Sequence, residues 1–179
     1  TLLRIISGLL TPSSGCVFID ETDIADNRVE ILQKIGYIAE NSPLYDYMSV
    51  YEFMNFVAGM RQLSASTFSQ RMEELIREFD LSNVINRKIG ELSKGFRHRV
   101  SIAAGVIHNP EILIMDEPAE GLDPNQKYSL IKFIKSYARH GIILLSTHIM
   151  EDVEASATRI LLLNEGKLVK DTTPTRLKH

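Results

Sequence analysis

Short aliphatic runs that end abruptly in polar residues constrain the fold of this chain more than any other feature. Two of them, Ile112–Met115 and Ile142–Leu145, are near-continuously apolar. Such runs are typical of central strands in a parallel sheet, where helices cover both faces. A segment of helical character follows each of them, and Ile160–Leu163 adds another strand. The pattern predicts an α/β fold with a mostly parallel central sheet.

The stretch between about residues 46 and 99 differs, because it has helical periodicity and no strand signal. Ser49 and Glu52 form a capping-box pair that opens one helix, and Thr67 and Gln70 are expected to open a second. The inner face of the first helix is predicted to hold Phe53, Phe56 and Val57. The apolar stripe of the second is predicted to hold Phe68, Met72, Leu75, Ile76 and Phe79.

The length of 179 residues suits a single domain. We expect its core at residues 1–45 and 100–179 and its helical subdomain at about 46–99. The net charge of -3 gives no overall attraction to nucleic acid, which is not an expected partner. Single Cys16 cannot form an internal disulfide, and the apolar runs are far shorter than the ~18–20 residues of a bilayer span. These features are expected of a soluble, cytosol-facing domain.

Polar residues follow the apolar runs where a parallel sheet binds its ligands, at the carboxyl ends of its strands. Asp116 and Glu117 follow the first run. Two adjacent carboxylates there suit a Mg²⁺ ligand beside a base that orients water, or they are simply solvated acids. His148 follows the second run and is either a functional group or a helix cap. Glu40 stands at the same edge, after a strand expected at Ile35–Ile38.

A fourth polar segment precedes a helix expected from Arg97 to about His108. Ser93 and Gly95 at a helix N-terminus would offer free N–H groups to an anion, and Lys94 adds positive charge. The alternative is a capped helix whose basic start is solvated.

Together these segments are similar in order and spacing to the nucleotide-binding subunit of ATP-binding cassette (ABC) transporters. Leu92–Phe96 resembles the family's LSGGQ signature, and Ile112–Pro118 resembles its Walker B strand with the catalytic glutamate. Gly121–Asp123 resembles the D-loop, and His148 the switch histidine. Ile35–Glu40 resembles the Q-loop. The resemblance covers essentially the whole chain.

The resemblance implies a P-loop NTPase fold of the ABC type that hydrolyses ATP with Mg²⁺. Glu117 and His148 would be catalytic, and Asp116 and Glu40 would contact the metal. The implied nucleotide-binding residues are Thr1, Ser93, Lys94, Gly95 and Asp123. Two subunits would clamp two ATP molecules between them, so that each site is shared.

The implied function is to power transport of a substrate through a partner membrane permease. The subunit would then lie on the cytoplasmic face of the cell membrane as a peripheral protein. Tyr45, Tyr47 and Met48 are candidates for exposed residues that contact the permease, or they are ordinary core residues.

Several residues depart from the family pattern. Glu40 stands where the family mostly has glutamine, so a metal-binding oxygen is kept and an amide donor is lost. Lys94 and Phe96 replace glycine and glutamine in the signature, and Glu120 replaces the D-loop serine. The LSKGF form and the segment after Glu40 are similar to exporter-type subunits, including the gliding-motility branch.

Two other kinds of ABC ATPase are alternatives. DNA-repair and chromosome-maintenance ATPases insert a long coiled coil between the Q-loop and the signature. Here Ser93 lies only 53 positions after Glu40, and no heptads are sustained. Translation-associated ABC proteins usually contain two cassettes, so a second cassette after His179 would favour that alternative.

In the family, Thr-Leu-Leu-Arg follows the glycine-rich phosphate loop. The resemblance therefore implies that this loop and the N-terminal strands precede Thr1 and are missing from the sequence given. Because the loop supplies the main phosphate cradle, we predict that residues 1–179 alone bind ATP weakly or not at all and are inactive as an ATPase. Tight ATP binding by purified 1–179 in a titration would contradict this prediction.

Overall fold

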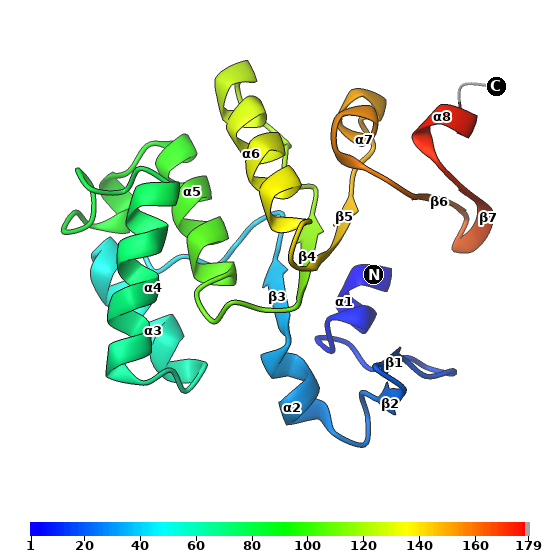
Figure 1. The fold of residues 1–179 in the computed structure, drawn as a ribbon, viewed down its shortest axis with the longest axis horizontal. Helices are drawn as coiled ribbons and strands as arrows, with labels where there is room; N and C mark the ends of the chain where they lie inside the picture. The colour runs from blue at the N-terminus through cyan, green and yellow to red at the C-terminus, as the bar shows by residue number, and fades with distance from the viewer. Residues whose placement is uncertain (178–179) are drawn as a thin grey trace.

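A three-stranded parallel sheet lies at the centre of the computed structural model, which describes residues 1–177 (Figure 1). Its strands are β3 (Ile35–Ile38), β4 (Ile112–Asp116) and β5 (Ile142–Ser146), in that order across the sheet. The register pairs Asp116 of β4 with Ser146 of β5, so that the polar ends of these strands lie side by side. The predicted α/β fold with a parallel sheet is confirmed.

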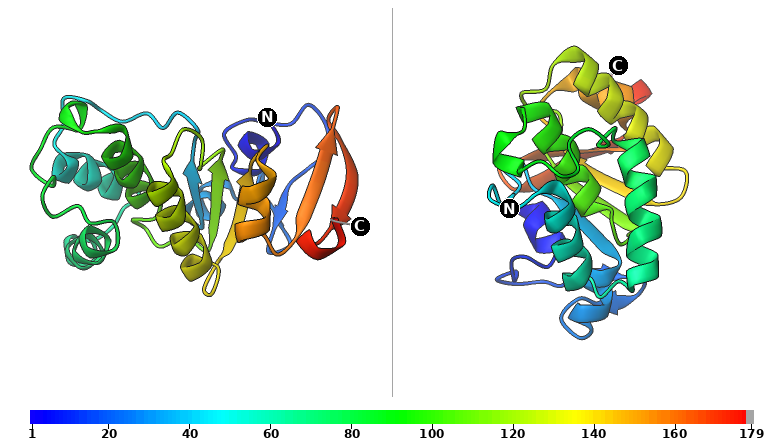
Figure 2. Two further views of the ribbon diagram at one scale, coloured as in Figure 1. Left: turned by 90° about the horizontal axis from the view of Figure 1, so that it is seen from above. Right: turned by 90° about the vertical axis from the view of Figure 1, so that its left-hand side faces the viewer.

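The other strands of the described chain form two antiparallel hairpins, which pair β1 (Phe18–Ile19) with β2 (Thr22–Asp23) and β6 (Ile160–Asn164) with β7 (Lys167–Thr172). The helices are α1 (Leu2–Ile6), α2 (Arg28–Gln33), α3 (Val50–Met60), α4 (Ala65–Glu78), a 3-10 turn (Ile89–Glu91), α5 (Lys94–Gly105), α6 (Pro124–Tyr137), α7 (Met150–Ser156) and α8 (Pro174–Leu177). Figures 1 and 2 place α3 and α4 at one end of the molecule and the β6–β7 hairpin at the other.

Alternate residues of β4 pack into two separate apolar clusters, one on each face of the sheet. Leu113 and Met115 are fully buried in the larger cluster, to which α3, α4, α5 and α6 contribute. Ile114 is equally buried on the opposite face, among residues of α1, α2 and β3. Burial on both faces is the reason for the continuous apolar run in this strand.

Two glycines allow α5 to pack directly on β3. A Cβ at Gly36 would lie 2.5 Å from the carbonyl oxygen of Gly105, and a Cβ at Gly105 would lie 2.7 Å from Cγ1 of Ile38. Both distances are too short for real side-chain carbon atoms. Because these two positions have no side chains, α5 can lie close to the sheet.

The predicted capping box of α3 is present in full. The Ser49 hydroxyl accepts from the Glu52 N–H, while the Glu52 carboxylate accepts from the Ser49 N–H at 2.8 Å. The inner face of α3 was predicted wrongly at one position, because Phe56 is 39% exposed. The buried residues of this helix are Val50, Phe53, Met54 and Ala58.

The start of α4 also differs from the prediction. Ser64, rather than Thr67, is the N-cap, and its hydroxyl accepts from the Thr67 N–H at 3.1 Å. A serine and a threonine three residues apart can each cap a helix, so composition alone does not select between them. The predicted stripe is confirmed, with Phe68, Met72, Leu75 and Phe79 buried and Ile76 packed against them.

The strand β5 is more exposed than its apolar sequence indicates. Ile142 is 64% exposed, and β5 pairs with β4 alone among the described residues. The run in β6 likewise lies in a hairpin rather than in the parallel sheet, with Leu161, Leu162 and Leu163 between 44% and 49% exposed. An apolar run indicates a strand that can be buried on both faces, but it does not specify the neighbours that bury it.

A neutral histidine, His108, contacts the amino end of β3. Nε2 of His108 lies 3.1 Å from the carbonyl oxygen of Ile35, and Nδ1 is buried without a hydrogen-bond partner in the described chain. Burial is the main cause that lowers the pKa of His108, and the positive charges of Arg61 and Arg71 act in the same direction. Against the contrary effect of the Ile35 carbonyl, the pKa falls to about 4.

The lowered pKa of His108 predicts a loss of stability in mild acid. Between pH 6.5 and 4 the unfolded chain takes up a proton at this histidine that the folded chain does not. The free energy of unfolding should therefore fall as pH drops through this range, by up to about 3 kcal/mol. Urea unfolding at pH 7.5 and pH 4.5 measures the difference. This difference in the free energy of unfolding should be smaller in His108→Gln. It should persist in the control His140→Gln, which alters an exposed histidine. An unchanged difference in His108→Gln would contradict the prediction.

Candidate functional site

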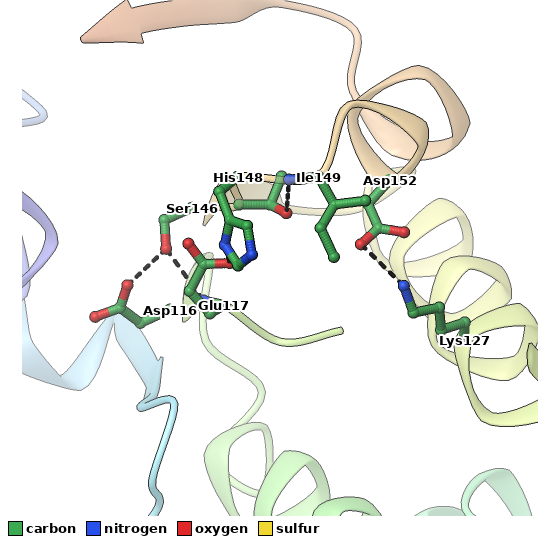
Figure 3. A network of polar contacts seen from close by, with 8 residues as sticks. Asp116, Glu117, Lys127, Ser146, His148, Ile149 and Asp152 are labelled. Carbon is green, nitrogen blue, oxygen red and sulfur yellow. Dashed lines mark hydrogen bonds and ion pairs between the residues drawn. The ribbon is translucent and has the colours of Figure 1, made fainter. Parts of the chain in front are cut away.

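A hydroxyl joins the two acids at the carboxyl end of β4. The Ser146 Oγ donates to Oδ1 of Asp116 at 2.5 Å and accepts from the Glu117 N–H at 3.0 Å (Figure 3). Because Ser146 and Asp116 are paired in the parallel register, neighbouring strand ends supply all three groups. The bridge fixes the backbone of Glu117 relative to the carboxylate of Asp116.

His148 lies against the second of these acids. Its Nδ1 is 3.1 Å from Oε2 of Glu117 (Figure 3). An ionised carboxylate only accepts hydrogen bonds, so Nδ1 carries the proton in this contact. The His148 side chain is 65% exposed and that of Glu117 only 22%. The histidine is thus open to a ligand, whereas the acid is sheltered beside it.

The backbone of Glu117 adopts a conformation that is unusual for a residue with a side chain. Its φ is +47°, in the left-handed region. Strain of this kind persists only where the surrounding structure enforces it, and it concentrates at functional sites. Here the hydrogen bond from the Glu117 N–H to Ser146 helps to hold it.

A tyrosine completes the surroundings of Asp116. The Tyr37 hydroxyl donates to Oδ2 of Asp116 at 3.4 Å. Burial raises the pKa of Tyr37, and the charge of Asp116 raises it further. The hydroxyl therefore stays protonated and able to donate.

The donor set at this edge fits a magnesium ion that is bound together with phosphates. In the described residues no group of three or more His, Cys, Asp or Glu side chains could by itself hold a metal ion. Mg²⁺ characteristically keeps several waters and is bound through one or two carboxylates plus substrate phosphates. Asp116, half-buried at the strand end, is a carboxylate of this kind.

The helix α5 begins earlier than predicted, at Lys94 rather than Arg97. Ser93 is its N-cap, and the Ser93 hydroxyl accepts from the Phe96 N–H at 3.4 Å. Lys94 and Gly95 thus belong to the first helical turn, whose N–H groups have no partner within the helix. Ser93 and Lys94 are exposed at this helix end, whereas Gly95 is buried.

The basic residues that follow are partly buried and make contacts within the fold. Arg97 forms an ion pair with Asp46 at 2.6 Å. The Arg99 guanidinium lies 4.0 Å from the centre of the Phe96 ring. Burial lowers the pKa of His98, although a hydrogen bond with the Pro118 backbone opposes this effect.

The start of α5 contacts the loop that precedes α6. A Cβ at Gly121, whose φ is +67°, would lie 2.2 Å from Nζ of Lys94. A Cβ at Gly95 would lie 2.4 Å from Nε2 of Gln126. Asp123 is the N-cap of α6, and its Oδ1 accepts from the N–H groups of residues 125 and 126 at 2.9 Å each.

The structure brings Asp116, Glu117 and His148 together, as expected from their positions at the carboxyl ends of neighbouring parallel strands. Lys94, Gly95 and Asp123 gather at the neighbouring helix starts, as described above. Thr1, Glu40 and Ser93 are exposed, and no described contact joins them to the Asp116 cluster. Ser146 and Tyr37 were missed, although both stand at or near strand ends, where the parallel register could have indicated them.

The residues considered for docking differ in exposure. Tyr47 is 71% exposed and its ring stacks on that of Tyr45, which is 39% exposed and also contacts Phe53 and Phe56. Met48 is only partly exposed and packs against the main core cluster, which favours the core alternative for this residue. Over the described residues, none of the helices is both long and apolar enough to cross a bilayer.

Fold and site together define an α/β protein with an acid–histidine cluster at the carboxyl edge of a parallel sheet. A family model described as "ABC transporter" matches residues 1–120, more than half of the chain. The chain therefore belongs to the ABC transporter family, as an ATP-binding subunit. The resemblance of the chain to this family is confirmed.

Individual relatives agree with this assignment. The chain is 34% identical over 171 residues to the ABC transporter ATP-binding protein NatA of Bacillus subtilis, covering 94% of this chain and 70% of NatA. It spans between 19% and 55% of the length of seven further curated relatives.

Two solved structures also share the fold. One, described as an ATP-binding subunit of an ABC transporter, has a TM-score of 0.87 and 28% identity over 99% of this chain and 74% of its own. The other is cbiO1 from Clostridium perfringens, described as part of the transporter complex cbiONQ. It has a TM-score of 0.85 and 25% identity over 99% of this chain and 73% of its own.

The bridging role of Ser146 predicts a measurable loss of stability in Ser146→Ala. The substitution leaves the half-buried Glu117 N–H without its acceptor and removes a donor from Asp116, which should cost about 1–3 kcal/mol. Urea unfolding measures the free-energy difference. The control is Ser129→Ala, which removes an exposed hydroxyl that bonds only to its own helix at Asn125. Equal stability of the two variants would contradict the proposed bridge.

Proposed function

We propose that the protein binds and hydrolyses ATP to power transport of a substrate through a partner membrane permease. The observation that carries this proposal is the 3.1 Å contact between His148 and Glu117, beside Asp116 at the carboxyl edge of the sheet. An acid and a histidine held side by side can act on an attacking water and on the terminal phosphoryl group together. Membership of the ABC transporter family supports the same chemistry.

In this proposal Glu117 polarises the attacking water and accepts its proton. General-base catalysis of this kind requires a carboxylate that is fixed and partly sheltered from solvent, and Glu117 is both. His148 steadies the γ-phosphate. In its imidazolium form both ring nitrogens donate, so that Nδ1 can stay on Glu117 while Nε2 donates to the phosphate.

Asp116 and Glu40 would hold Mg²⁺, Asp116 through a water molecule. The ion, when bound, neutralises charge on the phosphate oxygens. The hydroxyls of Ser146 and Tyr37 orient Asp116 for this role. Glu40 is exposed after the end of β3 and supplies an oxygen ligand, but unlike glutamine it has no N–H with which to orient water.

We propose that each nucleotide is shared between two subunits. Exposed Ser93 and the N–H groups of residues 94 and 95 in the first turn of α5 would bind the γ-phosphate held by the other subunit, and Lys94 would add positive charge. Thr1 would contact a phosphate within its own subunit. Asp123, which caps α6 next to the Lys94–Gly121 contact, would complete the shared interface.

The permease would dock on the helical part of the chain. Exposed Tyr45 and Tyr47 at its edge support this proposal, because aromatic residues are enriched in protein interfaces. The corresponding division of the domain is a catalytic core at 1–45 and 100–179 with a helical subdomain at about 46–99. A subunit docked in this way would lie on the cytoplasmic face of the membrane as a peripheral protein.

The proposal predicts that Glu117→Gln in the full-length protein still binds ATP but nearly abolishes turnover. Loss of a general base lowers rates by about 10²–10⁴-fold, whereas a neutral amide of similar size leaves the nucleotide contacts in place. Steady-state phosphate release and equilibrium binding of ATP measure the two quantities. Glu111→Gln, which changes an exposed acid before the opposite end of β4, should leave both unchanged. Near-normal turnover in Glu117→Gln would refute the assignment.

A further inference from the structure

One charged residue among the described residues is buried, and it lies just after the histidine loop. Asp152, in the first turn of α7, is 9% exposed, and its Oδ2 is buried without a hydrogen-bond partner in the described chain. A buried carboxylate needs a compensating positive charge. The nearest is Nζ of Lys127, 3.6 Å from Oδ2 of Asp152 (Figure 3).

Lys127 occupies an unfavourable position for a free cation. It lies in the first turns of α6, where the helix dipole disfavours positive charge. Its side chain is 29% exposed, and it lines a cavity of about 10 Å³ together with Asp152 and apolar residues of α6 and β5. In such a water-poor setting the attraction between the two charges is screened little.

The two partners belong to helices that follow directly from the two catalytic segments. Asp152 lies four residues after His148, and the intervening loop is tied by the Ile149 N–H, which donates to the Thr147 hydroxyl at 3.1 Å. Lys127 lies ten residues after Glu117. Two backbone hydrogen bonds lie in the segment between them. The N–H of residue 120 donates to the Glu117 carbonyl at 3.1 Å, and the Lys127 N–H donates to the carbonyl of residue 123 at 2.9 Å.

We propose that the Lys127–Asp152 ion pair positions His148 against Glu117 for ATP hydrolysis. The pair joins α6 to α7, the two helices that follow the segments carrying the acid and the histidine of the 3.1 Å contact. That contact is the one described interaction of the His148 side chain in residues 1–177, and the side chain is otherwise open to solvent. Its placement therefore depends on the backbone of its loop, which α7 anchors. The inference rests on the proposed function, and both residues are positioning residues that touch no substrate.

The test compares variants of the full-length protein that remove one charge each. Asp152→Asn and Lys127→Met should each lower kcat for ATP by about 10–100-fold, the size expected from a small displacement of a catalytic group. The KM for ATP should change less than about threefold, because nucleotide contacts remain. The double variant should lose no more than the worse single variant, as expected for residues that act as one unit. Lys127→Arg, which keeps the charge, should retain kcat within about threefold of the wild type, since it preserves the pairing.

Matched controls remove the same charges from neighbouring exposed positions. Glu151→Gln changes the acid next to Asp152 in the same helical turn, and Lys132→Met changes an exposed lysine on α6. Both should leave kcat within about twofold, because exposed charges away from the site contribute little.

A spectroscopic readout separates positioning from general stability. The imidazole NMR resonances of His148, assigned by comparison with His148→Gln, should shift in Asp152→Asn and Lys127→Met but not in the two controls. An unchanged kcat together with unshifted resonances in folded Asp152→Asn would overturn the proposal. If Asp152→Asn does not fold, Lys127→Met combined with Asp152→Leu removes both buried charges. Normal kcat in that folded variant would also overturn it.

Failure of this inference can be told apart from failure of the proposed function. If Glu117→Gln abolishes turnover while Asp152→Asn retains it, only the role of the ion pair is wrong. If Glu117→Gln retains turnover, the hydrolytic assignment is wrong, and the His148 resonances still decide whether the ion pair places this histidine.

Discussion

The parallel pairing of β4 with β5 is the constraint on which the rest of the site depends. Because the two strands run in the same direction with Asp116 opposite Ser146, their polar ends emerge at one edge. One hydroxyl then reaches both the Asp116 carboxylate and the Glu117 N–H. An antiparallel neighbour would place the end of β5 at the opposite edge. The acid pair, its bridging serine and the histidine loop are thus consequences of strand direction.

Burial on both faces keeps this edge rigid. β4 is packed between two apolar clusters, and its central residues have no exposed surface. On one face the glycines of β3 and α5 allow the helix to approach the strand so closely that neither position admits a side chain. The start of the same helix contacts the loop before α6 through Lys94 and Gly121. Core packing and the two polar regions are therefore parts of one arrangement.

The polar and charged groups of this region differ in their exposure to solvent. His148 and Ser93 face solvent, where a nucleotide can reach them. The Lys127–Asp152 pair is mostly enclosed, where charges that lose their partner become costly. The pair therefore constrains how α6 packs against α7.

The amino-acid sequence by itself determined which segments form β3, β4, β5 and β6, where the capping box of α3 lies, and which acids end β4. These features depend on periodicity and on hydrogen bonds between residues a few positions apart. Tertiary structure alone decided that Ser146 bridges the acids, that Tyr37 meets Asp116, that Ile142 is exposed and that Lys127 finds Asp152. Each of those outcomes depends on strand register or on helix packing between segments that are far apart in the sequence. The local sequence does not show which of these distant segments will lie side by side.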